Sequence, residues 1–426
     1  MKWYIITAFL LTFYGFLKEF RPTEPYLYDY QRHIQNISSN DLNNKIYPWW
    51  TYSYMIFLIP VFIFTDVLLY KIILALESVC FIVTWCLIIF EKSVGSQILM
   101  QIFYGGATAT EVAYFSYIYA YFEEKHYRKI TIGSRIFLNL GKCVSYFFAQ
   151  FIIQKYPHGY NILNYTSLGS LILAFVCVVF LPNIDWKKLK IEIEKNNKDI
   201  YIESYKDYAI YKIKSIWIST KQFFQNQSIY VWSLWWILST CGNFQIGNYI
   251  QSLWASADDY STSESNYNGL IEAICPLLSI ITIFLTQWII SFKKCLSLIS
   301  IILSAGISFA SLLIMTYSNS IFVMYTLYLI YRVIYQAMIT VSQYEISIAT
   351  DSSNLGFVFG VNTFFALVLQ SLLTFIVADK TVLGLPIRKQ FLIYAYYHLF
   401  IFLLLIIYVS YKIIKKRSVI INFFYN

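Results

Sequence analysis

The chain has 426 residues, of which 58% belong to the hydrophobic set AVILMFWYC and only 13% are charged, and its mean hydropathy is +0.56. A soluble domain has about a quarter of its residues charged, so this balance excludes a water-soluble fold and indicates a polytopic membrane protein. The net charge of +9 does not imply nucleic acid as a partner, because basic residues of a membrane protein follow its topology.

Twelve apolar runs are long enough to cross a hydrocarbon core of about 30 Å as helices. Lipid cannot satisfy an open backbone, and no barrel-like alternation occurs, so each run is predicted to be a helix. The first run lacks a small-residue cleavage site and is interpreted as a retained helix. The runs cover residues 3–20, 48–69, 71–90, 97–121, 131–153, 163–181, 228–254, 267–291, 295–317, 320–345, 355–378 and 390–412.

One long polar segment, residues 182–227, divides these runs into six plus six. It interleaves nine lysines with acidic residues and is interpreted as an amphipathic cytoplasmic linker, with a lipid-binding or regulatory element as the alternative. The predicted domains are an N-terminal six-helix half at 1–181, this linker, a C-terminal six-helix half at 228–414 and a cytoplasmic tail at 415–426.

The distribution of charge predicts that both termini are cytoplasmic. That orientation puts 20 Lys and Arg residues inside and nine outside, with Lys18 counted among the outside residues. The sequon at Asn36 then lies in the first outside loop, where it can be glycosylated. Twelve spans around a central cytoplasmic loop are typical of major-facilitator transporters, whose halves move about a midplane site. Channels, receptors and membrane enzymes stay open, because topology alone does not fix function.

The residues that usually carry metal or covalent chemistry form no recognisable pattern. The seven cysteines lie within or at the ends of apolar runs and are interpreted as small hydrophobic residues. The four histidines are scattered, and no HExxH, P-loop or GxSxG motif occurs. We therefore predict no metal, no cofactor and no enzyme activity, and expect a small solute and the lipid bilayer as partners.

Ionisable side chains inside the spans are the strongest functional signal. Each costs about 2.5 to 3.5 kcal/mol on insertion scales, so each is interpreted as functional or paired. Helical spacing places Thr108, Glu111 and Tyr114 on one face of the fourth span, together with Tyr104. A mid-span carboxylate among aromatic rings suits an organic cation. Further polar candidates are Gln245, Asn248 and Gln251 on the seventh span, Glu272 on the eighth and Arg332 on the tenth.

The sequence leaves the role of other charges near the spans open between substrate contact and structural pairing. Arg135 and Lys142 on the fifth span are either substrate or gating contacts or structural partners of carboxylates. The carboxylates in question are Glu111 and Asp66. Asp66 and Glu77 fall at or beyond the cytoplasmic ends of their spans, so they are interpreted as conformational or interface charges.

A series of short motifs runs along the chain: Arg-Pro-Thr-Glu-Pro-Tyr at 21–26, Tyr-Pro-Trp-Trp at 47–50, Glu-Val-Ala-Tyr at 111–114, Trp-Ser-Leu-Trp-Trp at 232–236, Tyr-Asn-Gly at 267–269, Phe-Gly-Val-Asn-Thr-Phe at 359–364 and Gly-Leu-Pro-Ile-Arg at 384–388. In this order they resemble the reduced folate carrier family, which contains folate and thiamine transporters. The resemblance covers residues 8–410 apart from the central loop. It implies a major-facilitator fold and import of a vitamin across the plasma membrane by alternating access.

Within that resemblance, three positions bear on the cargo. Glu111 stands where thiamine transporters have glutamate and the mammalian folate carrier has arginine, and Gln370 stands where the folate carrier has lysine. Both residues favour the cation thiamine. Arg332 stands where the folate carrier has an arginine and thiamine transporters a lysine. A folate transporter, with Arg332, Arg135 and Lys142 as anion contacts, is the first alternative, and a vitamin-binding surface receptor that does not transport is the second.

The resemblance to thiamine transporters also implies specific contacts. Trp50 and Tyr47 would stack on the aminopyrimidine, and Glu111 would accept a hydrogen bond from it. The implied substrate contacts are Glu24, Tyr47, Trp50, Glu111, Tyr114, Asn248 and Glu272, with Thr108, Arg135, Arg332 and Gln370 as further substrate or gating candidates and Asp66 as a conformational residue.

Overall fold

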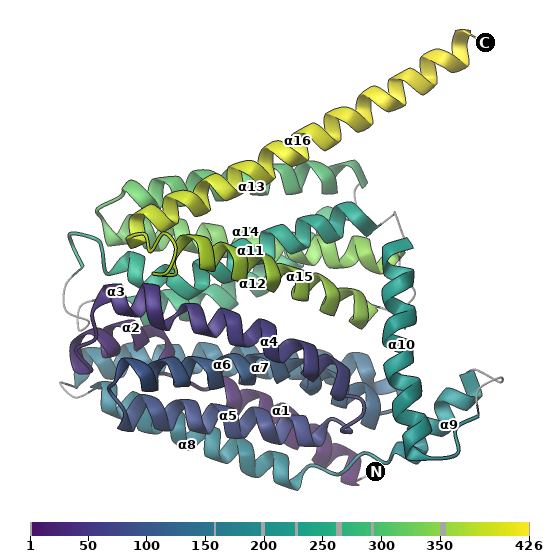
Figure 1. Ribbon diagram of the computed structural model, residues 1–426, viewed down its shortest axis with the longest axis horizontal. Helices are drawn as coiled ribbons and strands as arrows, with labels where there is room; N and C mark the ends of the chain where they lie inside the picture. Colours follow the sequence, from purple (N-terminus) through teal and green to yellow (C-terminus); the bar gives the residue numbers. More distant parts are fainter. Residues whose placement is uncertain are drawn as a thin grey trace. The chain divides into compact units, whose positions relative to one another are not determined.

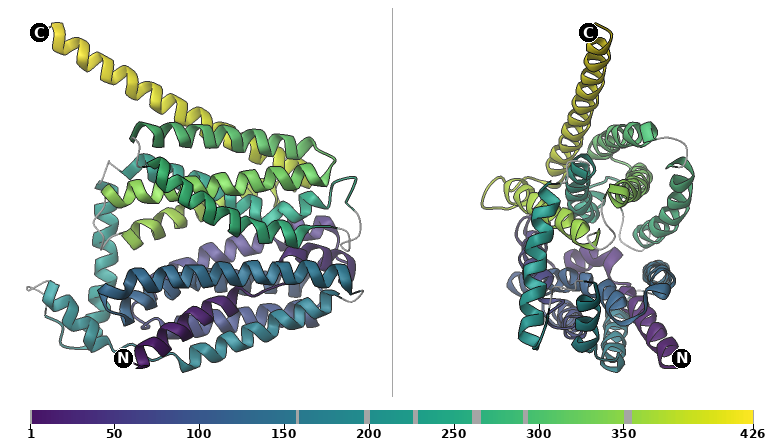
Figure 2. Two further views of the ribbon diagram at one scale, coloured as in Figure 1. Left: turned by 180° about the vertical axis from the view of Figure 1, so that it is seen from behind. Right: turned by 90° about the vertical axis from the view of Figure 1, so that its right-hand side faces the viewer.

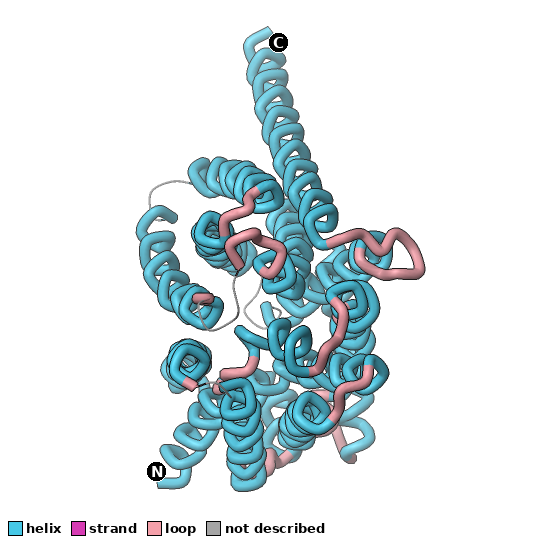
Figure 3. Tube along the Cα trace, turned by 90° about the vertical axis from the view of Figure 1, so that its left-hand side faces the viewer, coloured by secondary structure: helices cyan, strands magenta, loops and turns pink. Residues whose placement is uncertain are grey.

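A computed structural model of the chain describes residues 2–156, 159–196, 201–225, 229–260, 266–290, 294–349 and 355–425. Throughout these ranges every regular element is helical, and loops connect the helices (Figure 3). This agrees with the apolar runs, because a helix satisfies its own backbone hydrogen bonds in lipid.

The chain forms two compact units. Unit 1 comprises Met1–Gln227 together with Ser261–Pro276, and unit 2 comprises Ser228–Tyr260 together with Leu277–Asn426. Residues 261–276, which lie inside the predicted C-terminal half, thus group with unit 1. The first turns of one long helix, α12 (Asn268–Ile290), belong to that segment.

Unit 1 contains a bundle of long helices that pack side by side (Figure 1). Helix α5 packs against α6 and α8, α1 packs against α7 and α8, and α4 packs against α6. Pro48 occupies the first turn of α4, where its missing N–H costs nothing, and Ser93 caps α6 by accepting from the Ser96 amide. The bundle consists of α1 (Lys2–Glu19), α4 (Pro48–Phe64), α5 (Lys71–Phe90), α6 (Val94–Tyr121), α7 (Glu124–Lys155) and α8 (Gly159–Phe180).

Short helical turns join α1 to α4. Tyr26 and Tyr30 in this connection are buried against the bundle, and the Tyr30 hydroxyl donates to the Ile88 carbonyl at 3.2 Å. The connection is therefore part of the packed core of unit 1. Its elements are η1 (Glu24–Tyr26), α2 (Leu27–Asp29), η2 (Tyr30–Ile34), α3 (Ser39–Asp41) and η3 (Leu42–Ile46).

Unit 2 is a second helical bundle, in which α11 packs against α14, α15 and α16, and α13 packs against α14 and α16. Figure 2 shows α16 running along α13 and continuing past its end. The helices are α11 (Tyr230–Trp254), the second part of α12, α13 (Lys294–Tyr317), α14 (Ile321–Ala349), α15 (Leu355–Val377) and α16 (Ile387–Tyr425).

The polar segment between the two predicted halves folds into α9 (Trp186–Asn196) and α10 (Tyr205–Gln225). Helix α10 contacts the loop between α4 and α5, where Lys212 Nζ lies 3.2 Å from Asp66 Oδ2 and the Tyr205 hydroxyl donates to the Val67 carbonyl. Asp66 is therefore paired with a linker lysine, and the predicted alternative that Lys142 or Arg135 pairs with it is wrong.

Eight helical segments in the described ranges are long and apolar enough to cross a membrane, so the predicted twelve spans are not confirmed. Helices α6 and α11 are not among the eight. Both carry hydroxyl or amide side chains on most turns, which lowers their hydropathy. The eight segments are Ser39–Phe64, Lys71–Phe90, Lys129–Lys155, Gly159–Phe180, Ile299–Tyr317, Ile321–Ile348, Phe357–Val377 and Ile387–Ser410.

Candidate functional site

A buried ion pair joins α1 to α5 inside unit 1. Lys18 Nζ lies 2.8 Å from Glu77 Oε1, and the Tyr14 hydroxyl donates to Glu77 Oε2 at 2.7 Å. Lys18 and Glu77 are 2% and 0% exposed. Neither side chain is exposed, and the side of the membrane on which each lies stays a prediction. Each ion is buried because the other neutralises it.

A second set of charges runs from α7 through the end of α1 into η1. Lys142 Nζ lies 3.4 Å from Glu19 Oε2, which also accepts from Arg21 Nη2 at 2.8 Å. Arg21 Nε lies 3.2 Å from Glu24 Oε1, and the guanidinium carbon lies 4.6 Å from the centroid of the Phe81 ring. Lys142 thus pairs with Glu19, and the predicted alternative of Glu111 as its partner is wrong.

Glu24, a predicted substrate contact, is the acceptor of two tyrosine hydroxyls. Tyr104 donates to its Oε1 at 2.7 Å and Tyr146 donates to its Oε2 at 2.6 Å. Sequence reasoning missed Tyr146. The signal that could have found it is its spacing, since Tyr146 follows Lys142 by four residues on α7 and therefore shares its face.

Glu111 lies half-buried on α6, one turn beyond a connected set of aromatic and hydroxyl groups. The Trp50 indole N–H donates to Thr108 Oγ1 at 3.3 Å, and Thr108 donates to the Tyr104 carbonyl at 2.8 Å. The Trp50 and Tyr104 ring centroids are 6.4 Å apart. Within the described part of the chain, the Glu111 carboxylate makes no hydrogen bond or ion pair, although the buried Lys18 ammonium lies close enough for the two charges to interact.

Two predicted aromatic contacts are engaged with the protein. Tyr47 is buried and donates to the Gln31 side-chain oxygen at 2.9 Å. Tyr114 is fully buried and donates to the Leu11 carbonyl at 3.2 Å, while Lys18 Nζ lies 4.9 Å from the centroid of its ring. These contacts hold α1 and η2 against their neighbours, and the role of both tyrosines as substrate contacts stays a prediction.

The start of α12 brings Glu272 to the same region of unit 1. The Tyr26 hydroxyl accepts from the Gly269 amide at 3.3 Å, and Gln150 Oε1 accepts from the Leu270 amide at 3.0 Å. Glu272 lies close enough to Tyr146 for its charge to act on that phenol. Tyr146 therefore donates to Glu24 and lies within range of the Glu272 charge.

Some candidates of unit 1 lie at the surface. Arg135 is exposed on α7, and its guanidinium carbon lies 5.5 Å from the Phe115 ring centroid. Asn36 is exposed and has a left-handed backbone with φ of 57°, which asparagine tolerates better than most residues. Glycosylation of Asn36 and a gating role of Arg135 stay predictions.

Unit 2 carries the remaining candidates. Asn248 is half-buried on α11, Gln370 is fully buried on α15, and Arg332 on α14 donates to Asn243 Oδ1 at 2.9 Å. Gln245, which the sequence grouped with Asn248, donates to the Tyr394 hydroxyl at 2.7 Å. This glutamine therefore belongs to the packed interior of unit 2.

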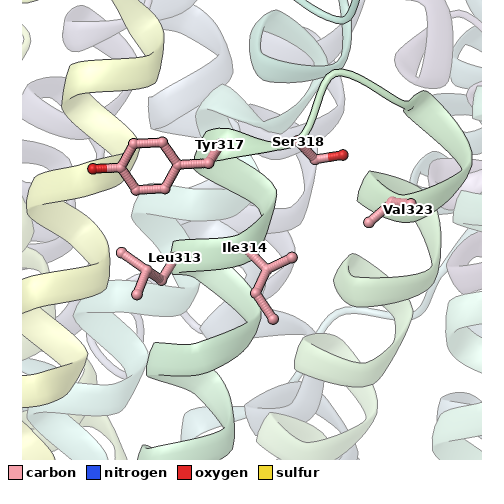
Figure 4. Close-up of a pocket in the computed structure, with 5 residues that line it drawn as sticks. All are labelled: Leu313, Ile314, Tyr317, Ser318 and Val323. Carbon is pink, nitrogen blue, oxygen red and sulfur yellow. The ribbon is translucent and has the colours of Figure 1, made fainter.

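A surface hollow at the turn between α13 and α14 does not resemble a vitamin site. Figure 4 shows that its lining is largely aliphatic and aromatic, with no charged side chain among its five residues. Nor do any three His, Cys, Asp or Glu side chains of the described ranges cluster as metal ligands would. The residues that line the hollow are Leu313, Ile314, Tyr317, Ser318 and Val323.

Comparison with known proteins gives a family and a fold. The sequence profile described as reduced folate carrier matches residues 1–393. Folate-like transporter 2 of Caenorhabditis elegans is 39% identical over 398 residues, covering 92% of this chain and 92% of its own length. Thiamine transporter 1 of Homo sapiens is 34% identical over 440 residues, covering 93% of this chain and 87% of that protein.

Among solved structures, the D-xylose-proton symporter matches with a TM-score of 0.68 at 13% identity, over 94% of this chain and 97% of that one. A POT family transporter matches with a TM-score of 0.64 at 13% identity, over 95% and 96% of the two chains. At such identities the likeness concerns the fold alone. It confirms the predicted class of an all-helical membrane protein of the major-facilitator type.

Proposed function

This chain belongs to the reduced folate carrier family, and from that premise we propose that it imports the organic cation thiamine across the plasma membrane by alternating access. The observation that carries the proposal is the Glu111 carboxylate, which forms no ion pair within the described residues and lies among the aromatic and hydroxyl groups of α4 and α6. Relatives named thiamine transporters support the same cargo.

The balance of charges inside unit 1 supports a cationic cargo. Lys18 and Glu77 neutralise each other, and Lys142 and Arg21 neutralise Glu19 and Glu24. Glu111 forms no such ion pair within the described residues, and a carboxylate inside a membrane is costly unless a positive ligand approaches. A thiazolium ion gains most at such a position, because charge attraction is strong where water is excluded.

The surroundings of Glu111 support recognition of a heteroaromatic ring as well as a charge. Trp50 and Tyr104 present neighbouring rings, and a cation over such faces gains about 0.5 to 2 kcal/mol. The Thr108 hydroxyl stands between these rings and Glu111 along α6. We propose Glu111, Trp50 and Thr108 as the centre of the thiamine site.

Folate is the second candidate cargo. Relatives named folate-like transporters are 39% identical to this chain, and Arg332 offers a guanidinium in unit 2. The dicarboxylate tail of folate, however, would be repelled by an ionised Glu111. Uptake of labelled thiamine and labelled reduced folate, measured side by side in expressing and mock-transfected cells, distinguishes the two cargoes.

Substitution of Glu111 tests directly whether its carboxylate binds the substrate. Glu111→Gln should reduce thiamine uptake at least tenfold, the scale of losing one charge-assisted contact of about 1.5 to 3 kcal/mol. Glu203→Gln, which neutralises an exposed carboxylate of the linker, is the matched control and should transport normally. Near-normal uptake by a surface-expressed Glu111→Gln variant would remove Glu111 from the site.

A vitamin-binding receptor is the remaining alternative. Counterflow separates it from a transporter, because only a transporter exchanges internal unlabelled thiamine for external label. Saturable binding without counterflow would favour the receptor.

A further inference from the structure

The Lys18–Glu77 pair contacts none of the proposed substrate contacts except Tyr114, yet it lies next to the proposed cation site. Glu77 holds the Lys18 ammonium at 2.8 Å, and Tyr14 occupies the other carboxylate oxygen at 2.7 Å. All three side chains are almost completely buried. Since each ion needs the other in that environment, the position of the ammonium depends on Glu77.

Glu111 lies close enough for its charge to act on both members of this pair. Lys18 Nζ stands 4.9 Å from the centroid of the Tyr114 ring, and Tyr114 follows Glu111 by three residues on α6, on the same face of that helix. Glu19 also faces Lys18, but it is already paired with Arg21 and Lys142. Glu111 is therefore the carboxylate that Lys18 would turn to if Glu77 lost its charge.

We propose that Glu77 is a positioning residue that keeps the Lys18 ammonium away from Glu111, so that the Glu111 carboxylate stays available to a cationic substrate. This inference rests on the proposed function, since it concerns the affinity of that same site. The protein would otherwise supply its own cation to Glu111, and the substrate would have to displace a tethered ammonium.

If Glu77 holds Lys18 away from Glu111, a single substitution of Glu77 should do more harm than the double substitution of Glu77 and Lys18. Glu77→Gln keeps an acceptor for the Tyr14 hydroxyl but frees Lys18 to pair with Glu111, so the KM for thiamine should rise at least about tenfold. The double variant Lys18→Met/Glu77→Gln removes the competing ammonium. Buried pairs are often replaced by neutral side chains without loss of stability, so its KM should return to within about threefold of the original value.

Uptake of labelled thiamine in cells, normalised to protein at the surface, measures both effects. An uncharged ring isostere of thiamine should inhibit uptake by the original chain and by Glu77→Gln with inhibition constants that differ less than about threefold, because it does not use the Glu111 charge. Equal KM values for the single and the double variant would overturn the inference. So would a loss of affinity for the uncharged isostere in Glu77→Gln that is as large as the loss for thiamine.

Lys18→Met alone keeps the inference testable if Glu77→Gln does not reach the surface. Without the ammonium, no side chain of this pair can compete with a cationic substrate for Glu111. The KM for thiamine should then be unchanged or lower, whereas a tenfold increase would contradict the inference. Absence of thiamine uptake by the unsubstituted chain would instead refute the proposed function, so the two failures are distinguishable.

Discussion

The interiors of the two units are built from different polar interactions. Unit 1 buries ions, and its polar groups are linked through charge: Lys18 with Glu77, and Arg21 with both Glu19 and Glu24. Such pairs repay the cost of dehydration only when the geometry is good and each ion retains its partner. Their presence in a membrane protein indicates that unit 1 is organised to hold charge.

Unit 2, by contrast, links several of its helices through neutral amides and hydroxyls, and its Arg332 donates to a neutral amide, that of Asn243. Gln245 donates to Tyr394 and accepts from Thr374 at 2.7 and 2.8 Å, and the hydroxyls of Thr240 and Tyr335 lie 3.0 Å apart. Neutral hydrogen bonds are weaker and less sensitive to the loss of one partner. The two interiors should therefore differ in how strongly each responds to the loss of one polar partner.

The largest effect is expected from removal of Arg21, the cation that pairs with two carboxylates inside unit 1. Arg21→Met would leave Glu24 without its cationic partner and weaken the hold on Glu19, which should lower the free energy of unfolding by about 3 to 5 kcal/mol. The midpoint of thermal unfolding of the purified protein in detergent measures the loss.

Arg135→Met provides the matched control for that experiment. Arg135 is exposed on α7 and contacts only the ring of Phe115 among the interactions described, so its replacement should change the unfolding midpoint little. If both variants unfold at the same temperature, the ion pairs of unit 1 do not stabilise its interior as the comparison requires.

A smaller effect is expected from the corresponding change in unit 2. Tyr394→Phe removes the hydroxyl that accepts from Gln245 and donates to Gln390 at 3.2 Å, at a cost of about 1 to 2 kcal/mol. Tyr396→Phe, at an exposed position two residues away on α16, should have no measurable effect. A loss for Tyr394→Phe as large as that for Arg21→Met would break the distinction between the two units.

The helical class could be predicted from the sequence because it depends on local pattern, and the same pattern singles out Glu111, whose role in the site stays a prediction. Long apolar runs exclude other structures in lipid, and Glu111 stands out because a lone carboxylate in the middle of such a run is costly. The sequence could not predict the ion pairs. Lys18 lies near the end of its run and looks like a charge at the membrane surface, while its partner Glu77 is 59 residues away.

The hydrogen-bond partners of the buried tyrosines could not be predicted from the sequence either. Tyr146 is one of 39 in the chain, and its spacing from Lys142 predicts its helical face but not that its hydroxyl reaches Glu24 on another element. Tyr114, placed by its helical face next to Glu111, instead donates to the Leu11 carbonyl of α1. Helical spacing predicts which residues share a face, but the neighbour of that face depends on tertiary packing.

The smallest predicted effect concerns an ion pair that joins the linker to the bundle of unit 1. Asp66 and Lys212 are 3.2 Å apart, with side chains 35% and 23% exposed, so solvent screens their attraction far more than that of the buried pairs. Lys212→Met should therefore speed amide hydrogen exchange in residues 205–216 only modestly, by about fivefold or less. High salt should mimic that change in the original chain.

Lys214→Met is the control, since Lys214 is exposed two residues further along α10 and should leave exchange unchanged. If Lys212→Met instead unfolds unit 1 or matches Arg21→Met in thermal stability, burial does not decide the strength of these ion pairs. An exposed pair would then be as strong as a buried one. The difference between the units would come from the particular partners of each charge and not from their burial.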